Sequence, residues 1–95
     1  MPTMLRRHFL VSGEVQGVGF RYYMRRRARQ LGITGWVRNR LDGRVEAEVQ
    51  GDTQAVATLE RMVRAGPPGS RVDEVGVADR PIIDGEQDFV ILVTS

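Results

Sequence analysis

The spacing of apolar side chains predicts five strands in this chain. Where apolar residues recur at every second position, one face of a strand is apolar and the other is polar. The alternation is clearest in the third segment, where valine and alanine face one way and Glu46, Glu48 and Gln50 face the other. In the first segment, Phe9 and Val11 share one face. The predicted strands are residues 6–12, 34–40, 44–50, 71–78 and 89–93.

Two segments change to helical spacing. From Phe20, apolar side chains recur every three or four residues as far as Gly32, and glycine commonly ends a helix. The second helix follows a potential cap at residues 51–53 and carries an apolar stripe around Leu59. The Gly-Pro-Pro-Gly of residues 66–69 stops it.

The order of these elements predicts an α+β fold of the ferredoxin-like class. The order βαββαβ with a short final strand is that of a split βαβ sandwich, so we expect an antiparallel sheet with two helices on one face. The Asp-Gly of residues 42–43 indicates a tight hairpin between the second and third strands. A bulge is expected at Glu74, and Ile82 and Ile83 are expected to anchor the polar stretch of residues 79–88.

The composition is that of one soluble domain. A chain of 95 residues leaves room for a single domain over residues 1–95. Apolar residues make up 41% and charged residues 27%, a balance typical of a folded globule rather than a disordered tail. No apolar run approaches the ~20 residues that span a bilayer, and the opening segment lacks the apolar stretch of a secretory signal. With no cysteine in addition, we expect a cytoplasmic protein without membrane association.

The inventory of reactive side chains excludes several kinds of enzyme. All 14 basic residues are arginine, which excludes Schiff-base chemistry and the lysine of the common phosphate-binding loop. The absence of cysteine excludes zinc-thiolate sites and a cysteine nucleophile. His8 is the only histidine, so we expect no metal site and no Ser-His-Asp triad. We interpret His8 as a structural or surface residue.

A glycine-spaced segment lies between the first strand and the first helix. Gly13, Gly17 and Gly19 can adopt positive φ, so successive backbone N–H groups can turn inward as an anion nest before the helix N-terminus. Arg21 lies in the first helical turn. A cation there opposes the helix dipole by ~0.3–1 kcal/mol, a penalty that makes sense if an anion lies between them. The alternative is a plain loop with an exposed arginine.

Residues 35–43 are the second segment with candidate chemistry. Asn39 belongs to a residue type that is depleted in strand interiors. It either helps the following turn or uses its amide, which donates and accepts at once, to hold a water beside a phosphoryl group. Trp36 is interpreted as packing in the core or on the sheet face rather than as a stacking platform.

Taken together, the two segments resemble the acylphosphatase family. The first reads Gly-Glu-Val-Gln-Gly-Val-Gly-Phe-Arg over residues 13–21, and the second reads Gly-Trp-Val-Arg-Asn over residues 35–39, followed by the Asp-Gly turn. The resemblance covers residues 6–91. It implies the ferredoxin-like fold, the hydrolysis of acyl phosphates to a carboxylate and inorganic phosphate, and no metal or organic cofactor.

The resemblance also implies roles for individual residues. Arg21 would be the substrate-binding arginine and Asn39 the water-positioning asparagine, and these are the two implied catalytic residues. One departure is Leu92, which stands where family members commonly have an arginine after a Phe-x-Ile element. This loss bears on C-terminal anchoring and not on the motif. The implied phosphate cradle consists of Gln16, Gly17, Val18, Gly19, Phe20 and Arg21.

The missing residue types fit the reaction that the resemblance implies. The leaving group is a carboxylate, a weak base, so a general acid is dispensable. The transition state of phosphoryl transfer is loose, so the attacking water needs no strong base. The protein then has to position the reacting groups and stabilise the charge of the transition state. We expect a small acyl phosphate as substrate, inorganic phosphate as product and competitive inhibitor, and a monomer.

Three other functions stay open at this point. A nucleic-acid-binding module is suggested by the arginines of the first helix, but the net charge is only +2 and the aromatic RNP pattern is missing, so we expect no specific nucleic-acid binding. A domain of a larger carbamoyl-transfer enzyme or a regulatory domain is disfavoured, because no further domain or zinc motif is present. A non-catalytic ligand-binding domain would release no phosphate from an acyl phosphate. The arginines, interpreted as a solvated helix face, are Arg25, Arg26, Arg27 and Arg29.

Overall fold

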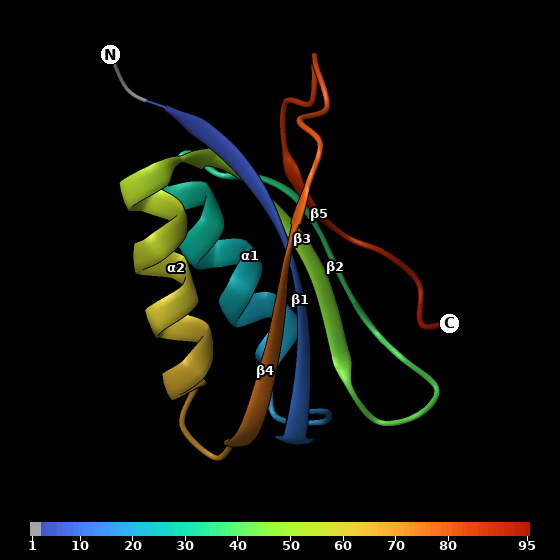
Figure 1. Cartoon of the computed structure of the whole chain (residues 1–95). Helices are drawn as coiled ribbons and strands as arrows, with labels where there is room; N and C mark the ends of the chain where they lie inside the picture. The colour runs from blue at the N-terminus through green and yellow to red at the C-terminus, as the bar shows by residue number, and fades with distance from the viewer. Residues whose placement is uncertain (1–2) are drawn as a thin grey trace.

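One sheet and two helices form two layers (Figure 1). The structure is a computed structural model, which describes residues 3–95. Both helices cover the same face of the sheet, and the predicted ferredoxin-like α+β fold is confirmed. In chain order the elements are β1 (Met4–Glu14), α1 (Phe20–Gln30), β2 (Thr34–Asn39), β3 (Val45–Asp52), α2 (Thr53–Ala65), β4 (Arg71–Arg80) and β5 (Phe89–Ile91).

The strand order in the sheet is β4-β1-β3-β2-β5. Within this order, β4, β1, β3 and β2 pair with their neighbours in antiparallel fashion, as predicted. β5 runs parallel to β2, with Gly35 opposite Phe89 and Val37 opposite Ile91, so the prediction of an antiparallel sheet is wrong at this edge. The reason is the preceding connection. β4 leads the chain to the end of the sheet at which β2 begins, and β5 starts from that same end (Figure 1).

The core lies between the sheet and the helices. Apolar side chains of β1 and β3 alternate onto this face and are fully buried: Phe9, Val11, Val45, Ala47 and Val49. The stripes predicted for the helices are buried against them: Phe20, Met24 and Ala28 from α1, and Val56, Leu59 and Val63 from α2. Full burial of such a side chain stabilises the fold by ~1.5–3 kcal/mol. Phe20, the first residue of α1, belongs to this core, so the core fixes where α1 begins. Neither helix within residues 3–95 is long and apolar enough to cross a membrane.

The turns and helix ends follow the predicted chemistry. Asp52 caps α2, because its carboxylate accepts the backbone N–H of Gln54 at 2.9 Å. Gly32 follows α1 with a φ of 70°, which glycine adopts without a Cβ penalty. The hairpin between β2 and β3 closes with the backbone N–H of Arg40 donating to the carbonyl of Arg44 at 2.8 Å.

β4 contains the predicted bulge one residue earlier than expected. Ser12 pairs with Glu74 and Gly13 pairs with Val72, so Asp73 is the extra residue. Gly13 has a φ of 130°, and a Cβ at this position would collide with the carbonyl oxygen of Arg71. The bulge and the glycine therefore belong together, at the point where β1 ends and the glycine-spaced segment begins.

Residues 79–88 differ from the prediction. β4 continues to Arg80, and the side chains of Ile82 and Ile83 are 42% and 47% exposed, so they do not anchor this stretch. Instead the buried side chain of Gln50 exchanges two hydrogen bonds of 2.9 Å with the backbone of Ile83. The face of the sheet beneath this stretch is polar, so polar contacts hold it.

The same face buries an arginine that sequence patterns did not single out. The side chain of Arg6 is 1% exposed, and its guanidinium donates to Glu48 at 2.6 Å, Gln50 at 3.1 Å and Glu86 at 2.8 Å. A buried cation needs partners of this kind to offset its lost hydration. Because Glu86 belongs to the connection between β4 and β5, this cluster fastens the connection to the sheet.

Candidate active site

The loop between β1 and α1 is held at both ends by buried side chains. Val15 is 1% exposed and Phe20 is 2% exposed. Between them, Gly17 and Gly19 have φ values of 75° and 78°. A Cβ at either glycine would meet no neighbouring atom, so the requirement for glycine here concerns backbone conformation rather than space. We call residues 16–21 the cradle loop.

The N-terminus of α1 offers unpaired backbone donors beside this loop. Gly19 is the N-cap, so no side chain caps the helix, and the first turn has no acidic residue. The backbone N–H groups of the first turn have no acceptor within the helix. Such a terminus attracts an anion through its N–H groups and the helix dipole. The local geometry is compatible with the anion nest, which stays a prediction.

Arg21 projects from this first turn of α1. Its side chain is half-buried, and its guanidinium carbon lies 6.0 Å from the ring centroid of Tyr22. Within residues 3–95 it makes no hydrogen bond and no ion pair, whereas Arg6, Arg38 and Arg40 all bind carboxylates. The guanidinium edge of Arg21 is thus free to donate to an anion.

Asn39 is the last residue of β2 and lies opposite Val45 of β3. It shares a strand face with Val37, which is fully buried against the helices, so alternation puts the half-buried Asn39 side chain on the helix-covered face. Its amide makes no hydrogen bond to any residue of the described chain, 3–95. Trp36 lies on the opposite face with the Arg38 guanidinium 5.3 Å from its ring, in agreement with sheet-face packing.

Gln16 joins the two candidate segments. Its side-chain Nε2 donates to the carbonyl of Arg40 at 2.7 Å and to the carbonyl of Arg44 at 2.9 Å. The cradle loop is thereby tied to the hairpin directly after Asn39. Both amide hydrogens of Gln16 are used in this way, so its remaining donor toward a ligand is its backbone N–H. Sequence reasoning placed Gln16 in the cradle but missed this contact.

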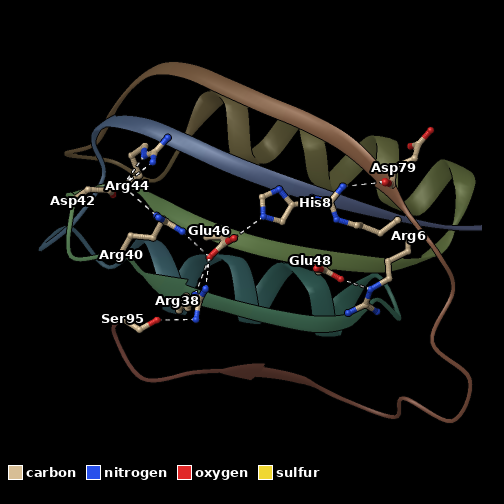
Figure 2. A network of polar contacts seen from close by, with 11 residues as sticks. Arg6, His8, Arg38, Arg40, Asp42, Arg44, Glu46, Glu48, Asp79 and Ser95 are labelled. Atoms are coloured by element: carbon tan, nitrogen blue, oxygen red, sulfur yellow. Dashed lines mark hydrogen bonds and ion pairs between the residues drawn. The ribbon is translucent and has the colours of Figure 1, made fainter.

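On the opposite face of the sheet, the Glu46 carboxylate contacts one histidine and two arginines (Figure 2). Its carboxylate lies 2.6 Å from Nε2 of His8, 2.7 Å from a guanidinium nitrogen of Arg38 and 3.3 Å from one of Arg40. Burial raises the pKa of Glu46, but the contacts with His8 and Arg38 outweigh it, and the pKa lies below its ordinary value. The polar alternation of β3 predicted the face of Glu46. The contact of His8 with Glu46 is compatible with the prediction of a structural or surface histidine, which stays a prediction.

The arginines of α1 have aromatic and acidic neighbours. The guanidinium carbon of Arg25 lies 5.2 Å from the ring centroid of Tyr22. Arg29 forms two hydrogen bonds of 3.1 Å with Asp88. These contacts suit the predicted solvated helix face, and the absence of specific nucleic-acid binding stays a prediction. No group of three or more potential metal ligands occurs among residues 3–95.

Comparison with known proteins assigns the chain to a family. The sequence model of the acylphosphatase family matches residues 7–91. The chain belongs to the acylphosphatase family. It is 52% identical over 82 residues to an acylphosphatase of Bifidobacterium longum (strain NCC 2705), which covers 86% of this chain and 84% of that protein.

Solved structures agree with this assignment. The fold is similar to the crystal structure of acylphosphatase from Bacillus subtilis, with a TM-score of 0.89 and 36% identity over 95% of this chain and 99% of that one. It is also similar to a part of full-length HypF in its phosphate- and nucleotide-bound form, with a TM-score of 0.88 and 29% identity over 99% of this chain and 12% of that one.

Membership of the acylphosphatase family establishes the class of reaction. The chain is an acylphosphatase, a hydrolase whose small-molecule substrate is an acyl phosphate. The resemblance seen in the two sequence segments is confirmed at the level of the family. The family match does not test which residues act, so the roles of the cradle loop, Arg21 and Asn39 stay predictions.

The segment that carries Leu92, where the resemblance implies an arginine, is held by main-chain contacts. The backbone N–H of Leu92 donates to the carbonyl of Val37 at 2.9 Å, which continues the pairing of β5 with β2. Ser95 then exchanges backbone hydrogen bonds with this hairpin: its N–H donates to Asn39 at 3.2 Å, and its carbonyl accepts from Leu41 at 3.1 Å. Main-chain bonds thus anchor residues 92–95 beside Asn39.

Proposed function

We propose that this acylphosphatase hydrolyses its substrate without a covalent intermediate and without a metal ion. The cradle loop holds the phosphoryl group, and Asn39 positions the attacking water. The observation that carries the proposal is the double hydrogen bond of Gln16 to the carbonyls of Arg40 and Arg44, because it joins the loop before α1 to the hairpin after Asn39. Two segments far apart in the sequence thereby border one site.

The phosphoryl oxygens bind to backbone donors and to Arg21. The N–H groups of the loop and of the first turn of α1 suit an anion, and the absence of an acidic residue in this turn leaves their positive potential uncancelled. Arg21 adds a charge-assisted contact, and such contacts are about twice as strong as neutral ones. The charge that develops on the phosphoryl oxygens in the transition state meets donors already in place.

The water binds to the Asn39 amide, which can accept one of its hydrogens and donate to another oxygen. The leaving carboxylate is a weak base and departs without a general acid. The loose transition state lets the water lose its proton late, so no strong base is required. This accounts for a site in which an arginine and an asparagine are the only side chains with assigned roles. Inorganic phosphate, which fits the same cradle, is a competitive inhibitor, and residues 1–95 act as one domain and as a monomer.

The test is the release of inorganic phosphate from an aryl acyl phosphate in the presence of a chelator, beside an aryl phosphate monoester of matched size. We expect undiminished activity with the chelator and little action on the monoester, since its leaving group is a stronger base that needs protonation. Comparable rates on the two substrates, or loss of activity with the chelator, would contradict the mechanism.

A further inference from the structure

The two neighbours of Asn39 in the chain are held by one carboxylate. Arg38 Nη2 lies 2.7 Å and Arg40 Nη1 lies 3.3 Å from Oε1 of Glu46. Because side chains alternate along a strand, these arginines lie on the face opposite to that of Asn39. Figure 2 shows Glu46 between them, with His8 on its other side. The main chain that carries Asn39 is therefore fastened immediately before and immediately after this residue.

Glu46 is itself held firmly. Its side chain is 12% exposed, and it lies directly opposite Arg38 in the pairing of β2 with β3. Its second oxygen contacts Nε2 of His8 on β1 at 2.6 Å. A carboxylate bound from two strands on either side has little freedom to move, so it can act as a fixed point for the hairpin.

The other contacts around Asn39 are formed by neutral groups and by Asp42, whose carboxylate lies 3.2 Å from Nε of Arg40. Gln16, in the loop between β1 and α1, holds the carbonyls of Arg40 and Arg44, and the N–H of Ser95 holds the carbonyl of Asn39. Among residues 3–95, Glu46 is the carboxylate that contacts both Arg38 and Arg40, the two residues that flank Asn39. Without its negative charge, the two guanidiniums repel each other across the residue that holds the water.

We propose that Glu46 is a positioning residue of this enzyme, which acts on the reaction through the placement of Asn39. The inference rests on the proposed role of Asn39. A catalytic group must be held within ~0.5 Å of its productive position, and a misplacement of about 1 Å can cost 10²-fold in rate. The substrate-binding groups lie on the other face of the sheet and make no contact with Glu46, so its influence falls on turnover rather than on binding.

The test compares Glu46→Gln with Glu48→Gln. Both residues lie on the same face of β3, and each binds arginine, but Glu48 contacts Arg6 at the end of the sheet away from Asn39. Glu46→Gln should lower kcat by at least about tenfold, by comparison with the cost of small misplacements. Its dissociation constant for inorganic phosphate should stay within about twofold of the wild-type value, because Glu46 does not contact the groups proposed to bind phosphate. Glu48→Gln should leave kcat unchanged.

A double variant distinguishes positioning from a general loss of structure. If Glu46 acts through Asn39, then Asn39→Ala and Asn39→Ala/Glu46→Gln should have the same kcat, because the placed group is already missing. Should Glu46→Gln fail to fold, Glu46→Asp takes its place with the same measurements, because a side chain shorter by one methylene withdraws the carboxylate from Arg38 and Arg40.

Three results would overturn the inference: an unchanged kcat in Glu46→Gln, an equal loss in Glu48→Gln, or a further loss when Glu46→Gln is added to Asn39→Ala. An unchanged kcat in Asn39→Ala has a different meaning. It would overturn the proposed role of Asn39, and this inference with it. The failure of the inference alone is therefore recognised by a slow Asn39→Ala enzyme beside a fully active Glu46→Gln enzyme.

Discussion

At the scale of single residues, Arg21 and Asn39 should fail differently when replaced. Arg21→Ala removes a charge-assisted contact of ~1.5–3 kcal/mol and should weaken the binding of substrate and of phosphate. Asn39→Ala removes the orientation of the water and should lower kcat by about 10²-fold, the effect of losing one preorganised donor. Phosphate should still bind Asn39→Ala, since the cradle loop and Arg21 remain.

Thermal unfolding with inorganic phosphate separates the two effects. At tenfold over its dissociation constant, a ligand adds ~1.4 kcal/mol to stability, which raises Tm by several degrees in a domain of this size. Wild type and Asn39→Ala should show this shift, and Arg21→Ala should lose it. The opposite pattern would mean that the roles of binder and water holder are exchanged.

Gln16 should affect binding and turnover together. Gln16→Ala removes two hydrogen bonds worth ~0.5–1.5 kcal/mol each and releases the cradle loop from the hairpin. We expect a higher KM, a lower kcat and a loss of stability of about 1–3 kcal/mol in urea unfolding. Gln30→Ala is the control, because Gln30 is an exposed residue at the end of α1. Normal kinetics in Gln16→Ala would show that the link is dispensable.

These residues differ in how much of their role the sequence alone could predict. Gly17, Gly19 and Arg21 stand at a junction of strand, loop and helix, whose chemistry is local and visible in the order of residues. Asn39 became a candidate through its unusual place in a strand, and its predicted role came from the resemblance to the family. The contact of Gln16 with Arg40 joins residues that are distant in the chain. A local sequence pattern does not show which distant residues meet in the fold. The residue identity was informative, but its partner depends on the fold.

At the scale of the elements, the contacts of Glu46 between β1, β2 and β3 should make stability depend on pH. The folded protein holds the pKa of Glu46 below its ordinary value of 4.5. A lowered pKa means that the carboxylate contributes stability above its unfolded pKa, and that this contribution disappears as the pH falls through the folded pKa. His8, Arg38 and Arg40 are the groups that lose their partner when Glu46 is protonated.

The measurement is the free energy of unfolding of wild type and Glu46→Gln from neutral pH downward. The wild type should be the more stable at neutral pH, and the difference should shrink as the pH falls below 4.5. Other carboxylates titrate equally in both proteins and cancel. A difference that stays constant across this range would show that Glu46 titrates with an unperturbed pKa or that its charge does not contribute.

The same elements show why secondary structure was easier to predict than pairing. The alternation of β3 correctly put Glu46, Glu48 and Gln50 on one face, because it depends only on neighbours in the chain. The partners of these residues depend on the register of three strands. The direction of β5 was missed for a related reason, since it depends on where β4 ends and not on the composition of residues 89–91.

At the scale of the whole molecule, Arg6 and the connection between β4 and β5 form a second polar centre, remote from the candidate site. Ile82 and Ile83 were expected to hold this connection, because apolar residues in a polar stretch commonly mark an anchor. The structure leaves them exposed and uses Arg6, Gln50 and Glu86 instead. Hydrophobic patterns cannot reveal an anchor made of charges, so this part of the fold was not predictable from them.

This arrangement predicts that stability and activity can be separated. Removing one partner of a buried ion pair costs about 3–5 kcal/mol, because the remaining charges are left without compensation. Arg6→Met should leave Glu48 and Glu86 in this state and lower Tm by more than about 10 °C in a domain of this size. The kcat at a temperature where the variant is folded should be unchanged, since Arg6 touches neither the cradle loop nor the hairpin.

Arg7→Met is the matched control for this experiment. Arg7 is the next residue along β1. Its ion pairs with Glu60 at 3.3 Å and Asp79 at 3.4 Å are longer than those of Arg6, and its side chain is 31% exposed. Exposed pairs contribute about 0–1 kcal/mol, so Tm should fall by only a few degrees. If the two variants lost equal stability, burial of Arg6 would not be what fastens the connection. If Arg6→Met also lost kcat, the two ends of the sheet would be coupled, and the β4–β5 connection would influence Asn39 along β2.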